Sequence, residues 1–214
     1  MPEPKGKPIK ITVYVDASHG QDLLTRRSVT GIFVLLNNTP IRWVSKRQKT
    51  VETSTYGSEL SAARVATEII IELRYHLRMI GVPLDDSAML LGDNMSVVIN
   101  TTLPSSVLKK KANAISYHKI RENIAGRIMK FAFVRSKTNL SDIFTKALDK
   151  PLFFPIVENY LFRKPGHTAK LRKSKEDQIN ITSFHNIGSI EIGEIILSII
   201  IPVSYTHLTL PTKA

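Results

Sequence analysis

Residues 9–16 read IKITVYVD and decide the architecture of this chain. Apolar side chains at the odd positions alternate with more polar ones, which is the two-residue period of a β-strand with one buried face. A polar loop over residues 18–27 follows. A β-rich run at 29–36 then meets another at 41–45 across Asn-Asn-Thr-Pro, a sequence typical of a hairpin turn. We therefore predict three successive strands.

A long amphipathic helix follows these strands. Apolar side chains recur at alternating steps of three and four between residues 63 and 80, which places them on one helix face, and Gly81 and Pro83 end the pattern. The downstream sequence predicts a strand at 88–91, a helix at 115–125, a strand at 128–134 and a helix over 141–148, with shorter apolar segments at 97–99 and 152–162. This order predicts an α/β fold with a mixed sheet.

The predicted domain covers residues 9–162. Residues 1–8 precede it as a leader, and residues 163–214 form a tail outside it that is partly artefactual. The most apolar run of the tail, 195–203, has nine residues, whereas a membrane-spanning helix needs about 20. The N-terminal residues lack the apolar stretch of a secretory signal. We therefore expect an intracellular, cytoplasmic protein that is not secreted and does not enter a membrane.

The composition favours a polyanionic partner. The 214 residues include 30 Lys and Arg against 18 Asp and Glu, a formal net charge of +12, and no cysteine. The lack of cysteine excludes a disulfide scaffold, a Cys-ligated zinc module and a thiol nucleophile. The positive charge favours nucleic acid over a membrane surface, because neutralising phosphates is what such charge does well. Residues 101–130 alone hold seven basic residues and one acidic residue.

Four acidic residues stand at predicted strand ends and helix starts. Asp16, Asp93 and Asp142 can each be interpreted as a turn former or a helix cap. Glu59 is different, because counting back four from Ala63 places it on the apolar stripe, where a buried carboxylate needs a partner, a proton or a cation. Its alternative is a frayed first turn that leaves the carboxylate in water. Together the four suggest a magnesium site, since two ions about 3.5–4 Å apart can hold the attacking and leaving oxygens of a phosphodiester.

Seven short motifs occur in order along residues 9–162: VDA at 15–17, TRRS at 25–28 followed by Gly31, WVSK at 43–46, STYGSEL at 54–60, GDN at 92–94, YHKIRE at 117–122 and SDIFTK at 141–146. Together they resemble the ribonuclease H region of copia-type LTR retrotransposon polyproteins. The resemblance implies a ribonuclease H-like fold, with a mixed five-stranded sheet flanked by helices. It also implies cleavage of the RNA strand of RNA–DNA hybrids during reverse transcription.

The same resemblance implies the site and its partners. The family's catalytic, metal-binding Asp-Glu-Asp-Asp set falls on Asp16, Glu59, Asp93 and Asp142. The implied cofactor is a pair of Mg2+ ions, with Mn2+ possible. The implied partners are an RNA–DNA hybrid and the reverse transcriptase domain of the same polyprotein, in a cytoplasmic virus-like particle.

Basic residues extend this interpretation. Lys109, Lys110, Lys111, Lys119 and Arg121 are predicted to contact the nucleic-acid backbone, although a charge run is more commonly a solvated face. His118 lies outside the predicted catalytic set, and Trp43 is expected in the core. Two positions depart from the family: Gly57 replaces a Glu present in many relatives, and Ala112 replaces a His, which leaves any role of position 112 open.

Two alternatives remain at this point. The chain could be a catalytically silent fragment of a decayed retrotransposon that binds nucleic acid through its charge. It could also be an integrase or resolvase domain, which shares the fold and cuts DNA. The Glu at the start of a helix after a three-stranded meander favours ribonuclease H over the integrase alternative.

Overall fold

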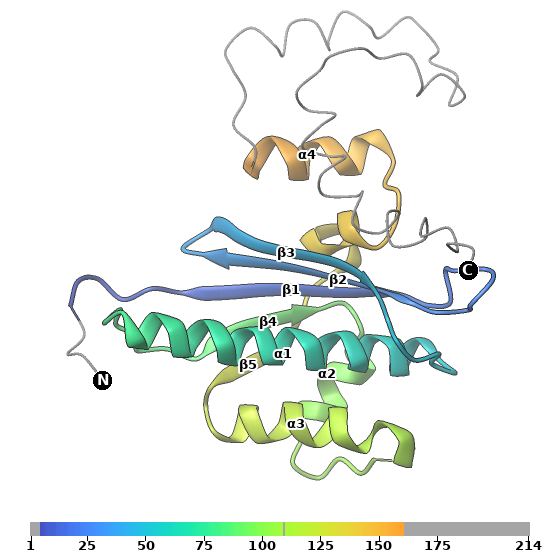
Figure 1. Ribbon diagram of the computed structural model, residues 1–214, viewed down its shortest axis with the longest axis horizontal. Coiled ribbons are helices and arrows are strands. Elements are labelled where there is room, and N and C mark those ends of the chain that lie inside the picture. The colour runs from blue at the N-terminus through green and yellow to red at the C-terminus, as the bar shows by residue number, and fades with distance from the viewer. Residues whose placement is uncertain (1–4, 109, 161–214) are drawn as a thin grey trace, which may run out of the picture. The chain divides into compact units, whose positions relative to one another are not determined.

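The computed structural model describes residues 5–108 and 110–160 (Figure 1). The chain divides into two compact units, Met1–Leu148 and Asp149–Ala214. In the described part of the second unit, the apolar segment predicted at 152–162 forms helix α4 (Lys150–Tyr160), which contains Pro155. The predicted boundaries at residues 8 and 162 stay predictions, and the tail predicted at 163–214 lies outside the described residues.

Five strands form one mixed sheet, in the order β3-β2-β1-β4-β5. They are β1 (Ile11–Ser18), β2 (Val29–Leu36), β3 (Thr39–Arg47), β4 (Ala88–Gly92) and β5 (Met129–Phe133). The first three are antiparallel, whereas β4 pairs parallel with both β1 and β5. The predicted α/β fold with a mixed five-stranded sheet flanked by helices is confirmed.

The turn between β2 and β3 follows from two asparagines. Asn37 and Asn38 have φ angles of 46° and 69°, which asparagine tolerates better than most residues and which a two-residue type I′ hairpin requires. The Asn37 side chain also accepts a hydrogen bond of 2.9 Å from the backbone N–H of Lys10. The hairpin predicted here is therefore held in place beside the start of β1.

Helix α1 (Thr55–Met79) packs across one face of the sheet and also contacts α3 (Ala114–Ala125) (Figure 1). Its apolar stripe is buried against β1, with Leu60, Ala63 and Ile70 at most 1% exposed. Ser54 caps the helix by accepting a hydrogen bond of 3.3 Å from the N–H of Gly57. The cap fixes where α1 begins and therefore where Glu59 points.

Helix α2 (Met95–Thr102) arises from the short apolar segment noted at 97–99. The side chain of Asn94 accepts a hydrogen bond of 3.3 Å from the N–H of Val97 and so starts the helix. None of the helices in the described part of the chain has the length and apolar composition that a membrane span requires.

Two expectations about elements were wrong. The helix predicted over 141–148 is a five-residue 3-10 helix, η3 (Leu140–Phe144), preceded by the shorter η2 (Ser136–Thr138). Trp43, expected in the core, is 47% exposed because it lies on β3, an edge strand that has a neighbouring strand on one side only.

Candidate metal-binding site

Three carboxylates from separate elements converge at one edge of the sheet. Asp16 lies near the end of β1, Asp93 directly follows β4, and Glu59 lies near the start of α1. Because β1 and β4 are parallel neighbours, their carboxyl ends lie side by side. Each residue offers one oxygen, and these oxygens all lie within 4.8 Å of one another. Such a spacing suits a shared divalent cation.

Glu59 is a buried carboxylate near the start of α1. It is 8% exposed and accepts a hydrogen bond of 3.3 Å from the backbone N–H of Ala17. Burial, together with the negative charges of Asp16 and Asp93, raises the pKa of Glu59 to about 9. The alternative of a frayed, wet first turn is therefore wrong, and Glu59 holds a proton at neutral pH unless a cation replaces it.

Asp142 reaches the same edge from η3 and is 6% exposed. Burial raises its pKa to about 6, against the opposing effect of a hydrogen bond from Lys146. Its Oδ2 accepts that hydrogen bond at 2.8 Å, whereas its buried Oδ1 has no hydrogen-bond partner among the described residues. Its charge also acts on Glu59. Asp142 therefore adjoins the group of three but is not among the oxygens that lie within 4.8 Å.

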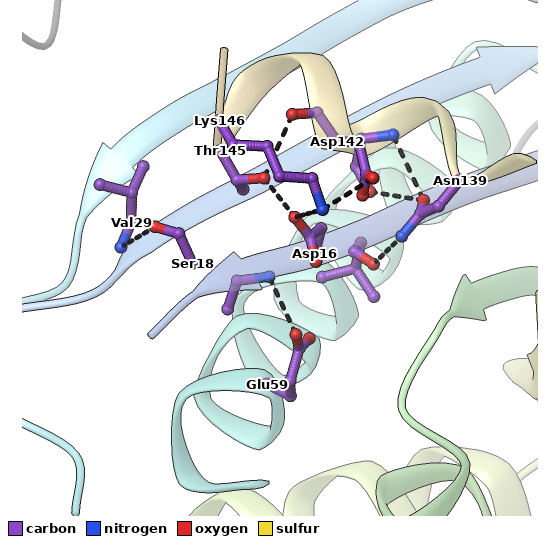
Figure 2. Close-up of polar contacts among 11 residues, drawn as sticks. Asp16, Ser18, Val29, Glu59, Asn139, Asp142, Thr145 and Lys146 are labelled. Atoms are coloured by element: carbon purple, nitrogen blue, oxygen red, sulfur yellow. Dashed lines mark hydrogen bonds and ion pairs between the residues drawn. The ribbon is translucent and has the colours of Figure 1, made fainter. Parts of the chain in front are cut away.

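Lys146 connects Asp142 to Asp16 (Figure 2). Its ammonium lies 2.8 Å from Oδ2 of Asp142 and 4.0 Å from Oδ2 of Asp16. Burial alone would lower the pKa of Lys146, but the hydrogen bond to Asp142 and the charge of Asp16 raise it. Lys146 is therefore a charged ammonium between two carboxylates.

Side chains on both sides of η3 fasten it to the sheet (Figure 2). Asn139 donates a hydrogen bond of 3.0 Å to the carbonyl of Val15, and its Oδ1 accepts from the N–H and hydroxyl of Ser141 at 3.3 and 2.6 Å. The hydroxyl of Thr145 donates to Oδ2 of Asp16. These contacts tie the segment that carries Asp142 to the strand that carries Asp16.

Gly31 allows η3 to approach the sheet closely. It lies on β2 directly opposite Asp16. A Cβ atom at this position would lie 2.6 Å from Cγ2 of Thr145 and 2.8 Å from the carbonyl oxygen of Ser141, both closer than packed atoms come. Only a residue without a side chain lets η3 lie this close to β2.

The sequence pattern singles out the four acids, whose role in a site stays a prediction, but not the residues that hold them in place. Gly31, Thr145 and Lys146 lie inside the quoted motifs, and Asn139 lies two residues before one of them. Nothing in the local pattern indicates that a glycine on a strand packs against a 3-10 helix more than 100 residues later.

The residues fit a hard divalent cation. Within the described residues, three carboxylate oxygens share one small volume, a buried carboxylate carries a raised pKa, and a buried oxygen of Asp142 has no hydrogen-bond partner. Oxygen donors of this kind are the ligands that Mg2+ and Mn2+ take in proteins. The assignment of particular acids to particular ions stays a prediction.

The basic residues predicted to contact nucleic acid differ in their surroundings. Lys109 lies outside the described residues. Lys111 is exposed in η1 (Lys111–Asn113), Lys119 is half-buried on α3, and the ammonium of exposed Lys110 lies 3.3 Å from Oγ of Ser54 at the start of α1. Their contact with nucleic acid stays a prediction.

Arg121, also predicted to bind nucleic acid, contacts the protein itself. Its guanidinium donates hydrogen bonds to the carbonyls of Asn100, Leu103 and Pro104 at 3.2, 2.6 and 3.0 Å and lies 5.1 Å from the centre of the Tyr117 ring. These contacts hold the loop between α2 and α3. A contact of Arg121 with nucleic acid also stays a prediction.

One of the two family departures, Gly57, has a local structural explanation. A Cβ atom at Gly57 would lie 2.5 Å from a carboxylate oxygen of Glu52, so the Glu52 side chain fills the space beside this turn of α1. Ala112 is exposed in η1. His118 is exposed on α3, and its ring lies edge-on to Tyr117 at 5.1 Å. Its exclusion from the predicted catalytic set stays a prediction.

Comparison with known proteins places these features among transposon polyproteins. No family model matches the chain. It is 30% identical over 152 residues to the retrovirus-related Pol polyprotein from transposon RE1 of Arabidopsis thaliana, and 29% identical over 152 residues to that from transposon RE2 of the same plant. Each match covers 70% of this chain and 10% of the polyprotein. The Pol polyprotein from transposon TNT 1-94 of Nicotiana tabacum is 27% identical over 140 residues, which are 65% of this chain and 10% of that polyprotein.

Solved structures with a similar arrangement share little sequence. The structure of LC11-RNase H1 in complex with an RNA/DNA hybrid is 19% identical, with a TM-score of 0.49, and the match covers 67% of this chain and 99% of that chain. RNase H1 from the halophilic archaeon Halobacterium salinarum is 16% identical, with a TM-score of 0.47 and coverages of 62% and 90%. Compared with the transposon Pol polyproteins, the chain spans about a tenth of the length of the curated relatives it matches.

Proposed function

We propose that this chain, a homologue of the retrovirus-related Pol polyproteins of plant transposons, is the ribonuclease H region of a copia-type LTR retrotransposon polyprotein. It hydrolyses the RNA strand of RNA–DNA hybrids during reverse transcription. One observation carries this proposal: the oxygens of Asp16, Glu59 and Asp93, which come from distant parts of the sequence, lie within 4.8 Å of one another. Asp142 adjoins them through Lys146.

The acids would hold two divalent ions, Mg2+ or in its place Mn2+. Asp16, Glu59 and Asp93 would hold one, and Asp16 and Asp142 would help to hold the other. When bound, such ions supply activation of the attacking water and neutralisation of charge on the departing 3′ oxygen. Cleavage leaves 5′-phosphate and 3′-hydroxyl ends.

The protein's own groups keep these ligands in position. Thr145 fixes one oxygen of Asp16 by a hydrogen bond, and Asn139 anchors the segment that carries Asp142. Fixed ligand positions matter because displacing a reacting group by about 1 Å can lower the reaction rate about 10²-fold. Selectivity for RNA would come from contacts to 2′-hydroxyls in the wide minor groove and not from base reading, so sequence preference would be weak.

The partners follow from the same proposal. The RNA–DNA hybrid binds along the basic surface that includes Lys110, Lys111 and Lys119. The reverse transcriptase domain of the same polyprotein makes additional contacts with the hybrid. The cytoplasmic, virus-like particle location predicted from the sequence stays a prediction.

A cleavage assay tests the function. A hybrid labelled on the RNA strand is incubated with Mg2+ and either the wild-type chain or Asp93→Asn, and binding is measured in parallel. We expect Asp93→Asn to bind the hybrid but to lose about 10²–10³-fold in cleavage rate, the scale of losing one electrostatic stabiliser. Asp85→Asn, which neutralises an exposed acid after α1, should leave the rate unchanged.

The same assay separates the alternatives. Equal binding without cleavage by wild type and Asp93→Asn would support a catalytically silent fragment. Cleavage of a DNA duplex in preference to the hybrid would support the integrase-like alternative.

A further inference from the structure

We propose that the ammonium of Lys146 is a built-in cation of the Asp16–Asp142 pair, and that a divalent ion binds to this pair only by displacing it. This inference rests on the proposed function, because it concerns the same carboxylates. It adds that the two ion positions are not equivalent and that Lys146 sets the order in which they fill.

The first step compares the solvent exposure of the three side chains. The side chains of Asp16 and Asp142 are 5% and 9% exposed, whereas that of Lys146 is 45% exposed. The carboxylates are fixed by their surroundings, and Asp16 is further held by the hydroxyl of Thr145. The lysine side chain has a flexible four-carbon stem and solvent beside it. Lys146 is therefore the partner that can leave without disturbing the fold.

The second step is the contrast between the two sides of the carboxylate group. Asp16 and Asp142 lie beside the ammonium at 4.0 and 2.8 Å. Among the described residues, Glu59 and Asp93 form no salt bridge with a lysine or arginine. An ion that enters beside Glu59 and Asp93 therefore displaces no basic side chain of the described residues, whereas an ion that enters beside Asp142 must displace the ammonium of Lys146.

The third step is the orphaned oxygen of Asp142. Its Oδ2 accepts a hydrogen bond from Lys146, but its buried Oδ1 finds no hydrogen-bond partner within residues 5–108 and 110–160. A buried carboxylate is normally satisfied on both oxygens. Lys146 therefore leaves one carboxylate oxygen of the pair without a partner. A divalent ion coordinated by both carboxylates would also bind this oxygen, which favours the ion over the ammonium. An ammonium that only partly satisfies the pair can be exchanged.

Two consequences follow for binding. The first ion binds to Asp16, Glu59 and Asp93 while Lys146 stays in place. The second binds more weakly than the carboxylates alone would allow, because the Lys146 ion pair must break before it enters. Removing the ammonium should therefore strengthen binding of the second ion and leave the first nearly unchanged.

The test counts Mn2+ ions bound per full-length chain as Mn2+ rises, by electron paramagnetic resonance of the free ion. Wild type is compared with Lys146→Met and with Lys137→Met, which removes an exposed lysine from η2. For Lys146→Met we expect the second ion to bind at a concentration lower by about tenfold, or 1.4 kcal/mol. Lys137→Met should match wild type. Equal second-ion affinity in Lys146→Met and wild type would overturn the inference.

A measurement on the wild-type chain keeps the test independent of any folding defect in the variant. An amine-acylating reagent is applied with and without Mn2+, and acylation at each lysine is read by mass spectrometry. Mn2+ should increase the reaction of Lys146 severalfold and leave Lys137 unchanged, because displacement frees the amine. Lys146 acylation that does not respond to Mn2+ would contradict the inference.

These readouts do not depend on cleavage. If Lys146 neither weakens Mn2+ binding nor responds to it while the hybrid is cut, the inference fails and the proposed function stands. If Mn2+ binding responds to Lys146 as expected but no hybrid is cut, the inference holds and the proposed function fails.

Discussion

Glu59 makes the stability of the metal-free protein depend on pH. Its pKa in the folded protein is about 9, against 4.5 for a free glutamate. Below pH 4.5 both the folded and the unfolded states hold the proton. Between about pH 4.5 and 9 the unfolded state releases it and the folded state keeps it, so the free energy of unfolding falls as pH rises through this window. A bound cation removes this penalty, because it stabilises the ionised form.

Replacing Glu59 with Gln should abolish this pH dependence. Gln cannot ionise in either state, so the metal-free variant escapes the loss of stability at high pH. With a chelator present, we expect Glu59→Gln to unfold several degrees above wild type at pH 8, with a much smaller difference at pH 5, since 1 kcal/mol corresponds to roughly 2–4 °C for domains of this size. Thermal unfolding followed by circular dichroism measures the difference.

A matched variant, Glu122→Gln, neutralises an exposed acid on α3 and should follow the wild-type curve at both pH values. Asp142, with its pKa raised to about 6, leaves a smaller dependence between about pH 4 and 6 in all three proteins. A Glu59→Gln difference that is equal at pH 5 and pH 8 would mean that Glu59 is ionised in the metal-free fold.

At the scale of elements, the contact between β2 and η3 decides whether Asp142 reaches the site. Gly31→Ala adds a methyl group that would lie 2.6 Å from Thr145 and 2.8 Å from the backbone of Ser141. Because a backbone atom cannot give way cheaply, η3 must shift. We expect a loss of about 1–3 kcal/mol in stability, measured by urea unfolding, together with weaker Mn2+ binding on the Asp142 side.

Gly57→Ala is the matched control for this variant. The added methyl group would meet the end of the Glu52 side chain, which can rotate away, and alanine favours the helix that contains the position. It should therefore keep wild-type stability and Mn2+ binding to within experimental error. Equal stability of Gly31→Ala and wild type would show that η3 is free to move away from the sheet.

The elements also show what a single sequence can and cannot reveal. β2 matches its prediction residue for residue, and β1, α1 and β4 differ from theirs only at the ends, because period-two and helical patterns report burial on one face directly. The segment at 97–99 lacked an assignment, since three apolar residues do not define a period and its start depends on the Asn94 side chain.

Residues whose roles depend on distant contacts could not be predicted in the same way. The helix over 141–148 is a short 3-10 helix because Asn139 and Thr145 are committed to β1 and not to helix continuation. Trp43 is exposed because it lies on the edge strand β3. The position of a strand within a sheet is not encoded in the local sequence, so this exposure could not be predicted. The position of Glu59 is predictable, in contrast, because a carboxylate on an apolar helix stripe needs a partner, a proton or a cation.

At the scale of the whole molecule, the main hydrophobic core cluster of the described residues runs from Ile11 to Phe131, and the predicted domain ends at 162. A chain that ends at residue 162 should therefore keep the thermal stability of the full chain and its increase on adding Mn2+. Thermal unfolding of both chains, with and without Mn2+, measures this. A loss of the Mn2+ effect in the shorter chain would mean that residues 163–214 contribute to the site.

The bond between Thr145 and Asp16 joins residues 129 positions apart in the sequence. During synthesis the ribosome releases Asp16, Glu59 and Asp93 long before the segment that carries Asp142. A nascent chain that has emerged only as far as Asp93 therefore holds three of the four acids. It lacks the segment with Asp142 and Thr145 that completes the set. The four-acid set is therefore completed only after residues 139–146 have emerged and packed against β1.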